Sequence, residues 1–364
     1  MRILVAMSGG VDSSVVAGLL REQGHEVIGA TLQLYDHGAA TSRKGACCAG
    51  QDIHDARRVA DALDIPHYVL DRESRFRDAV VQDFADSYAK GETPIPCIRC
   101  NQTVKFHDLV GLARDLGAEA MATGHYVRRV EGPAGPELHR AADPERDQSY
   151  FLFATTPAQL AFSRFPLGDY PDKAAVRAVA ARLGLAVAEK PDSQDICFVP
   201  AGRYHDVVAR HRPDAAEAGE IVHLDGRVLG RHQGIARFTV GQGRGLGQAS
   251  RDGEEPLYVA GVEAGTRRVV VGPRRALPQA VVEVAEVNWL APPPAGPLRC
   301  QVKLRARERP QAAEAAWDAA AGLLRVTPAE AAIAAPGQAC VLYAGDRVLG
   351  GGFIRRAMGR VAAA

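Results

Sequence analysis

A serine- and glycine-rich segment, Ser8-Gly9-Gly10-Val11-Asp12-Ser13-Ser14, follows a short apolar run at the start of the chain. Glycines let a backbone approach a phosphate closely, and their N–H groups can surround an anion. A helix that begins directly afterwards points its positive end at the same place. Ser8 and Ser13 can donate hydroxyl hydrogen bonds, and Asp12, at an expected exposed helix start, can hold a Mg²⁺ beside a departing pyrophosphate. The segment therefore predicts a nucleotide-binding loop.

Two commoner phosphate-binding patterns are excluded. The P-loop pattern GxxxxGK[ST] needs a Gly-Lys dipeptide, and the chain contains none. A Rossmann glycine fingerprint is also absent from this segment. The alternative is a turn that merely caps a helix. The position between a buried-looking strand and an amphipathic helix favours the nucleotide-binding loop.

Cysteines form the second group of candidate residues. The chain has seven, which are too few and too scattered for a disulfide scaffold. Cys97 and Cys100 stand just before a helix expected to begin near Thr103, with Arg99 and Lys105 close by in the sequence. Such surroundings lower the pKa of a thiol and predict a reactive cysteine.

Cys197 ends a polar segment, Lys190–Val199. Taken alone, such a cysteine is more often a buried core residue than a nucleophile.

The elements that must position these residues follow from the hydrophobic pattern. At 364 residues the chain exceeds what one core usually supports. In the first third, strands alternate with helices, which predicts a doubly wound parallel α/β sheet. The expected elements are strands at 3–7, 26–32, 67–70 and 118–123 and helices at 13–22, 51–64, 75–89, 103–116 and 173–184.

Short β runs replace this alternation from about residue 219. They include 220–224, 228–229, 238–240 and 257–262, then 281–287, 299–304, 323–326, 339–342 and 348–354. This pattern predicts a small central β domain followed by a β-barrel. The expected domains are 1–205, 206–278 and 279–364, and the Ala-rich stretch 312–335 is read as compositional bias.

Charge and composition narrow the class of protein. The net charge of +1 does not itself indicate a nucleic-acid partner. Between Arg267 and Pro310, however, nine Arg or Lys residues stand against three Glu, an excess that is either a solvated face or a surface for phosphates. No signal-peptide pattern and no run of 18 apolar residues is present, so we expect a cytoplasmic protein without a membrane partner.

Taken together, these segments resemble the tRNA-specific 2-thiouridylase family (MnmA/TrmU), over nearly the whole chain. The shared segments are SGGVDSS at 8–14, PCIRCN at 96–101, TGHY at 123–126, RDQSYFL at 146–152, DSQDICF at 192–198, TVGQ at 239–242 and GLG at 245–247. The first of them is typical of the PP-loop ATPases, which cleave ATP between its α and β phosphates. The resemblance implies a PP-loop domain, a small central β domain and a C-terminal β-barrel that contacts tRNA.

The resemblance also implies roles for individual residues. Cys100 corresponds to the catalytic nucleophile and Cys197 to the persulfide carrier, and the two form a transient disulfide. The implied ATP contacts are Ala6, Met7, Ser8, Gly9, Gly10, Val11, Asp12, Ser13, Leu32 and Gly124. The implied contacts with the target base and the tRNA are Ile95, Pro96, Cys97, Arg146, Asp147, Gln148 and Arg305.

Two departures from the family pattern concern these contacts. Many relatives carry Asn-Pro-Asp where this chain has Ile95-Pro96-Cys97, so a thiol replaces a carboxylate. A general-base role at position 97 is thereby in doubt, and a CxxC pattern is created. Some relatives present Arg-Tyr to the tRNA where this chain has Arg305-Ala306, so a stacking ring is missing.

The implied reaction makes 2-thiouridine at the wobble position, U34, of tRNAs for lysine, glutamate and glutamine. ATP, with Mg²⁺, adenylates uracil O2 and releases pyrophosphate; sulfur then attacks C2 and AMP leaves. The sulfur comes from a cysteine desulfurase or a relay protein as a persulfide on Cys197. Attack by Cys100 releases hydrosulfide and leaves a Cys100–Cys197 disulfide, which a reductant reopens.

Three alternatives remain open. An amidating synthetase of the same fold would let ammonia attack the adenylate and would not need paired cysteines. RNA thiolation could instead use an iron–sulfur cluster on Cys97, Cys100 and Cys197. The chain could also be a β-barrel RNA-binding protein with a degenerate nucleotide fold. The thiouridylase-like reaction is preferred because the loop and the cysteines occur together in the family's order.

Overall fold

The computed structural model describes residues 1–35, 48–192, 196–199, 203–253 and 255–355. Cys47 and residues 193–195 of the DSQDICF segment lie outside the described residues. The chain divides into two compact units. The first contains Met1–Val80, Cys97–Pro200 and Asp346–Val348, and the second contains Val81–Pro96, Ala201–Gly345 and Leu349–Ala364.

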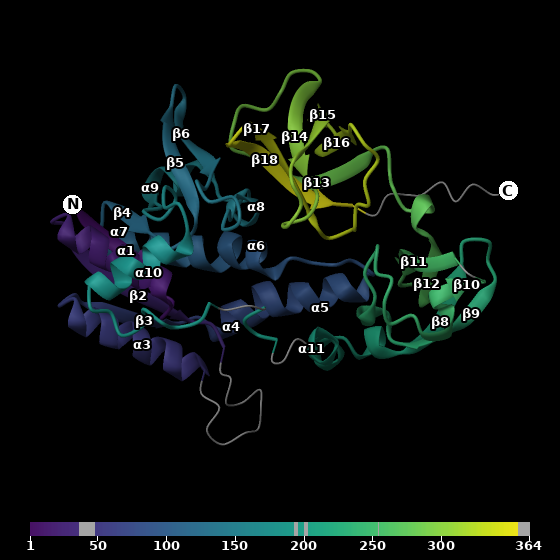
Figure 1. Cartoon of the computed structure of the whole chain (residues 1–364), viewed down its shortest axis with the longest axis horizontal. Coiled ribbons are helices and arrows are strands. Elements are labelled where there is room, and N and C mark those ends of the chain that lie inside the picture. The colour runs from purple at the N-terminus through teal and green to yellow at the C-terminus, as the bar shows by residue number, and fades with distance from the viewer. Residues whose placement is uncertain (36–47, 193–195, 200–202, 254, 356–364) are drawn as a thin grey trace. The chain divides into compact units, whose positions relative to one another are not determined.

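A five-stranded parallel sheet forms the centre of the first unit (Figure 1). Its strands are β1 (Arg2–Ala6), β2 (Glu26–Gln33), β3 (His67–Asp71), β4 (Ala120–Ala122) and β7 (Ser163–Arg164), in the order β3-β2-β1-β4-β7. Every pairing in it is parallel. The predicted parallel α/β fold is therefore confirmed.

Alternation along β1 decides which side chains meet which helices. Ile3 and Val5 join a buried cluster with Val15, Val59 and Val176. These three valines come from α1 (Val11–Glu22), α3 (Cys48–Ala62) and α10 (Lys173–Arg182). Leu4, fully buried, points to the opposite face, as expected for successive residues of a strand. The helix α7 (Phe106–Asp115) also contacts β1.

The strand order reverses between β1 and β4, since β2 lies on one side of β1 and β4 on the other. In open parallel sheets, ligands bind outside the carboxyl ends of the strands at this reversal. The segment 7–10 follows β1 and Thr123-Gly124 follows β4. The predicted nucleotide loop thus lies where this fold class places a ligand.

The helix expected to begin near Thr103 starts earlier. The helix α6 (Pro96–Cys100) continues into a π-helix (Asn101–Lys105) and then into α7. Proline suits a first helical position because its missing N–H has no partner there. Cys97 and Cys100 accordingly lie within a helix and not before one, so this sequence prediction was wrong. The predicted helix at 75–89 is likewise interrupted by a π-turn, between α4 (Glu73–Phe76) and α5 (Gln82–Ala89).

The first unit also contains elements that the sequence pattern did not predict. They are the hairpin β5 (Val127–Gly132) and β6 (Gly135–Arg140) and the short helices α8 (Ser149–Leu152) and α9 (Pro157–Phe162).

Two β assemblies make up most of the second unit, which also contains α5 and α11 (Tyr204–His211). The first is a sheet of β8 (Ala218–His223), β9 (Val228–Gln233), β10 (Arg251–Asp252), β11 (Glu255–Glu263) and β12 (Arg268–Pro273), in the order β10-β11-β12-β8-β9. The strand expected at 238–240 is absent there, because a short 3-10 helix, Ile235–Arg237, leads into a turn.

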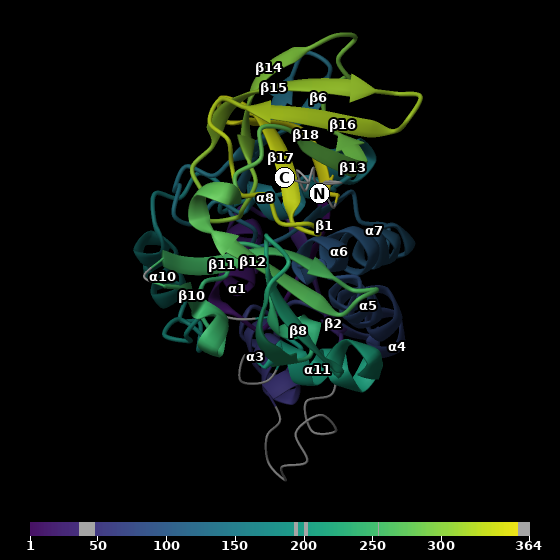
Figure 2. The same cartoon turned by 90° about the vertical axis from the view of Figure 1, so that its right-hand side faces the viewer.

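The second assembly is a closed barrel (Figure 2). Its strands are β13 (Val282–Trp289), β14 (Leu298–Lys303), β15 (Gln311–Asp318), β16 (Leu323–Pro328), β17 (Ala339–Ala344) and β18 (Arg347–Ile354). They run in the order β13-β16-β15-β14-β17-β18, and β13 pairs with β18 to close the ring. The predicted small β domain and C-terminal barrel are confirmed. Within the described residues, no helix is long and apolar enough to cross a membrane.

Candidate active site

The predicted nucleotide loop leaves the first turn of α1 open for an anion. Gly9 has φ +73°, and Gly10, the N-cap residue, supplies no side-chain cap. The Ser13 hydroxyl accepts a hydrogen bond from the Ser8 backbone N–H at 3.1 Å, which closes the loop on itself. The helix N-terminus therefore keeps its positive end free of a side-chain cap, as anion binding requires.

Gly124 is packed against this loop. A Cβ at position 124 would lie 2.9 Å from the Ser13 nitrogen and 3.0 Å from the Asp12 carbonyl carbon. The segment after β4 therefore approaches the start of α1 as closely as a glycine allows. Leu32, at the end of β2, is half-buried.

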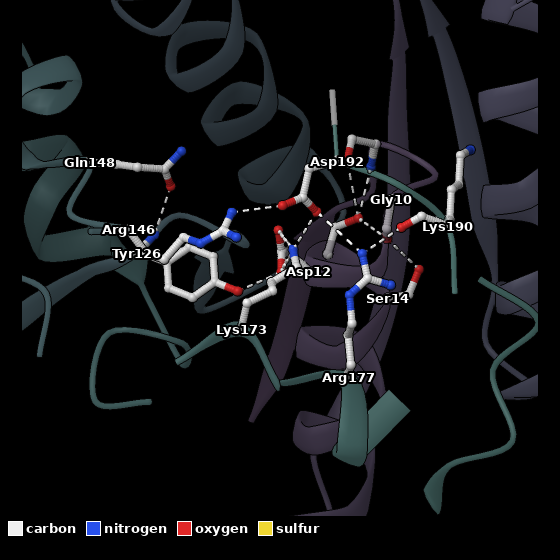
Figure 3. Close-up of polar contacts among 12 residues, drawn as sticks. Gly10, Asp12, Ser14, Tyr126, Arg146, Gln148, Lys173, Arg177, Lys190 and Asp192 are labelled. Atoms are coloured by element: carbon white, nitrogen blue, oxygen red, sulfur yellow. Dashed lines mark hydrogen bonds and ion pairs between the residues drawn. The ribbon is translucent and has the colours of Figure 1, made fainter. Parts of the chain in front are cut away.

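Asp12 is paired with a cation of the protein itself (Figure 3). Its two carboxylate oxygens accept hydrogen bonds from Lys173 Nζ at 2.8 and 2.7 Å. One of them also accepts from the Tyr126 hydroxyl at 2.7 Å. The side chain of Asp12 is 30% exposed, so it is less open than the sequence suggested. A magnesium ion on Asp12 would have to compete with the Lys173 ammonium.

Lys173 extends this network to Asp192, in the segment that leads to Cys197. The ammonium lies 2.7 Å from Asp192 Oδ1, and Arg146 donates to Asp192 Oδ2 at 2.7 Å. Burial alone would raise the pKa of Asp192, but the hydrogen bonds from Lys173 and Arg146 outweigh it and lower that pKa. The carboxylate is therefore ionised and shared by two cations.

A second lysine meets the loop from the other side. Lys190 Nζ donates to the Gly9 carbonyl at 3.0 Å and to the carboxylates of Asp52 and Asp55 at 2.7 and 2.6 Å. Burial opposes its charge, yet the two carboxylates raise the pKa of Lys190. The loop 8–13 is thus flanked by two ammonium groups.

Local sequence carries no signal for either lysine. They lie far along the chain from the loop, and only the tertiary fold brings them to it.

Lys105 is the charged group that acts on all three site cysteines. Its ammonium lowers the thiol pKa of Cys97, Cys100 and Cys197, and negative sulfur in turn raises the pKa of Lys105. For Cys97 and Cys100, desolvation by the surrounding protein is the larger effect and raises both pKa values. The expectation of a lowered pKa at Cys100 was therefore wrong, because this thiol is inside the helix and only 5% exposed.

Cys197 is exposed but tightly surrounded. Desolvation raises its pKa to about 12 even though Lys105 and a hydrogen bond from Tyr35 act in the opposite direction. The Phe76 ring contacts the rings of Tyr35 and Phe198, with centroid distances of 6.0 Å and 5.6 Å. The aromatic cluster positions the segment that carries Cys197.

His125 is neutral at this site. Burial, aided by Lys105, lowers the pKa of its imidazole to about 3. Nδ1 lies 2.8 Å from the Thr123 hydroxyl, and the ring stacks on Phe106 with centroids 6.1 Å apart. It can therefore exchange a hydrogen bond with a substrate without adding charge.

The expected RNA contacts in the first unit differ in accessibility. Arg146 has a side chain 41% exposed. Gln148 accepts a hydrogen bond from the Tyr126 N–H at 2.8 Å. The Asp147 side chain is only 1% exposed, and its oxygens accept from the Ser149 N–H and hydroxyl. Asp147 thus stabilises the turn before α8.

Ile95, Pro96 and Arg305 belong to the second unit. Ile95 is half-buried and Pro96, the first residue of α6, is buried. The Arg305 side chain is 39% exposed and lies 3.6 Å from Glu308.

The described side chains do not form a metal-binding group. Among them, no three His, Cys, Asp or Glu residues come close enough together to hold a metal ion. Cys97, Cys100 and Cys197 are among the described residues for which this holds. Asp12, the expected magnesium ligand, forms an ion pair with Lys173.

Family models match almost the whole chain. A tRNA methyl transferase HUP domain matches residues 1–201, a tRNA methyl transferase PRC-barrel domain matches 205–273, and an aminomethyltransferase β-barrel domain matches 280–354.

Curated relatives are similar over the same length. A tRNA-specific 2-thiouridylase MnmA of Acidiphilium cryptum is 68% identical over 97% of this chain and 100% of that protein. Those of Rhodospirillum centenum and Gluconobacter oxydans are 64% and 62% identical, over 98% and 97% of this chain and 92% and 99% of theirs. On sequence identity and domain order alike, the chain belongs to the MnmA family of tRNA-specific 2-thiouridylases.

Proposed function

We propose that this chain catalyses ATP-dependent 2-thiolation of the wobble uridine, U34, of tRNA. One observation carries the proposal. The same compact unit contains a nucleotide loop without a side-chain cap and the three cysteines that interact electrostatically with Lys105. The family models are named for methyl transfer, but the cysteines favour sulfur chemistry, as the relatives' names do. The substrates are expected to be the tRNAs for lysine, glutamate and glutamine.

ATP has the role of making uracil O2 a leaving group. The first-turn N–H groups of α1 and the two flanking lysines are suited to polyphosphate. The α-phosphate is transferred to O2, pyrophosphate departs, and AMP leaves when sulfur attacks C2. Magnesium, if it accompanies ATP, is expected to bind through the nucleotide phosphates, since both Asp12 oxygens already accept from Lys173.

Sulfur transfer uses two thiols in this proposal. A cysteine desulfurase or relay protein hands its terminal sulfur to Cys197, so that Cys197–SH and R–S–SH become Cys197–S–SH and R–SH. Cys100 then attacks the inner sulfur, giving the Cys100–Cys197 disulfide and hydrosulfide, which displaces AMP from C2. A thiol reductant restores both cysteines. Cys197 is exposed, which agrees with its role of accepting sulfur from a donor protein. Cys100 is buried, which agrees with its role of attacking the persulfide inside the protein.

The test is a reconstituted reaction. The full chain is incubated with tRNA, ATP, Mg²⁺ and a persulfide donor, and the tRNA nucleosides are identified by mass spectrometry. We expect 2-thiouridine together with stoichiometric AMP and pyrophosphate. Pyrophosphate without a thiolated nucleoside would contradict sulfur transfer. A thiolated nucleoside without AMP would contradict the adenylate.

A further inference from the structure

Lys173 serves two carboxylates at once (Figure 3). Its ammonium lies within 2.8 Å of both oxygens of Asp12 and 2.7 Å from Asp192 Oδ1, and its side chain is 10% exposed. An ammonium has three N–H donors, and three carboxylate oxygens surround this one. A further anion can bind Lys173 only by displacing one of them.

Asp192 is the partner more easily displaced. Without Lys173 it keeps Arg146 at 2.7 Å and Arg177 at 3.7 Å. Among the described residues, Asp12 would keep the hydrogen bond of the neutral Tyr126 hydroxyl at 2.7 Å and the more distant charge of Arg146, with no direct ion pair. Leaving a partly buried carboxylate without a cation costs more than leaving one that retains its salt bridges. Exchange at Lys173 therefore favours release of Asp192.

The incoming anion is defined by the position of Lys173. Asp12 lies in the first turn of α1, so Lys173 Nζ stands beside the open N–H groups of the nucleotide loop. A triphosphate bound at those N–H groups carries several negative charges against the single charge of Asp192, and it attracts the ammonium more strongly.

We propose that Lys173 binds the β- or γ-phosphate of ATP and gives up Asp192 in exchange. This inference rests on the proposed function, since it takes ATP as the ligand of the loop. Asp192 precedes Cys197 in the same segment, so the exchange changes the ion pairs of the sulfur-bearing segment whenever nucleotide binds. Asp192 is then a positioning residue that competes with ATP.

Two substitutions at this ion pair separate the exchange from a structural role. Binding of α,β-methylene-ATP with Mg²⁺ to the full chain is measured by calorimetry. Lys173→Met should weaken binding at least about tenfold, and Lys173→Arg should retain most of it. Asp192→Asn should tighten binding several-fold, because the amide no longer competes for the ammonium. Glu22→Gln, at the exposed Arg182–Glu22 pair between α1 and α10, is the matched control and should leave affinity unchanged.

Opposite effects of K173M and D192N are the signature of exchange. If both variants weaken binding, or neither changes it, the pair is only structural and the proposal is overturned. A melting temperature for each variant identifies unfolding, and Asp192→Ser replaces D192N if that variant is unstable. Failure of the unmodified chain to bind the analogue would refute the nucleotide assignment itself. Binding without opposite shifts would refute the exchange alone.

Discussion

The three site cysteines differ in accessibility although one cation acts on them all. Cys97 and Cys197 are exposed and Cys100 is 5% exposed. Thiol exchange depends on access to each sulfur, so an outside sulfur donor reaches an exposed thiol more readily than a buried one. Burial therefore distinguishes the proposed carrier, Cys197, from the proposed resolving thiol, Cys100.

Serine substitutions test these roles with a donor that carries sulfur-34. Cys197→Ser should abolish thiolation and leave no label on the enzyme, because the accepting thiol is gone. Cys100→Ser should still load label at Cys197 but turn over poorly, since nothing releases the sulfur. Cys97→Ser should retain most activity, because the relay uses only two sulfurs. Peptide mass spectrometry locates the label, and nucleoside analysis gives the rate.

A cluster-based reaction expects another pattern. Loss of any one of three ligands would then stop activity comparably and remove visible absorbance from anaerobically purified protein. A Cys97→Ser enzyme as inactive as Cys197→Ser would therefore count against the relay, and near-normal activity would count against the cluster.

The pH dependence of Cys197 reactivity follows from its raised pKa of about 12. Below this pKa the thiolate fraction rises about tenfold per pH unit. Alkylation of Cys197 by iodoacetamide should therefore accelerate from pH 7 to pH 10 without a plateau. Lys105→Met should slow it at every pH, because the ammonium lowers the pKa of this thiol, while Lys90→Met, at an exposed position, should not. Alkylation is measured by mass spectrometry of the Cys197 peptide. A plateau in its rate near pH 8 would disprove the raised pKa of Cys197.

Among the elements, the loop after β1 and the segment after β4 approach each other closely at the predicted nucleotide site. Gly124 has no room for a side chain against Asp12 and Ser13. A displacement at Gly124 would therefore act directly on the first-turn N–H groups of α1.

Gly124→Ala should push the start of α1 outwards. We expect weaker binding of α,β-methylene-ATP and a loss of about 1–3 kcal/mol in the free energy of unfolding. Gly111→Ala is the matched control, since a Cβ there meets nothing within 4 Å on the exposed side of α7. It should stabilise the protein by up to about 1 kcal/mol, because alanine is the better helix former. Affinity for the ATP analogue is measured in both variants, and urea unfolding gives their stability. Equal affinity in the two variants would show that the close approach of Gly124 to Asp12 and Ser13 is unimportant for nucleotide binding.

The success of sequence-based prediction varied among these elements for physical reasons. The predicted nucleotide loop is a local pattern of strand, glycines and helix, so its position between β1 and α1 could be predicted from spacing. The start of α6 was missed because the helix was expected only from about Thr103, whereas it begins at Pro96, and proline suits a first helical turn. Strand β15 was missed because alanine, frequent in it, carries little β propensity, and pairing with β14 and β16 overrides that. The pairings of Lys173 and Lys190 depend on tertiary contacts that no local pattern encodes.

At the scale of the whole molecule, the chain leading to Cys97 is held by the second unit. The Thr93 N–H donates to the Pro336 carbonyl at 2.7 Å, and the Gln338 amide donates to the Thr93 carbonyl at 2.8 Å. The Thr93 hydroxyl also lies 3.1 Å from that of Thr239. Within the second unit, the central β domain and the barrel thus both hold Thr93.

The basic stretch of the barrel provides a test of RNA binding in the full chain. Replacing Arg305, Arg307 and Arg309 by alanine should weaken tRNA binding and flatten its salt dependence, by roughly one in log–log slope for each phosphate that the protein no longer neutralises. Affinity for α,β-methylene-ATP should not change, because the loop and its lysines lie in the first unit. Arg182→Ala, in an exposed ion pair of that unit, is the control. An unaltered salt slope in filter-binding titrations would rule out this surface.

The position of Lys105 among the three cysteines has a consequence for the order of chemical events. One positive charge acts on three thiols; a negative Cys97 raises the pKa of Cys100, and negative Cys97 and Cys100 raise that of Cys197. We therefore infer that Lys105 favours a single negative sulfur at a time among these thiols. In the proposed reaction, loading of Cys197, attack by Cys100 and departure of hydrosulfide would then occur one after another, each anion leaving or being neutralised before the next one forms.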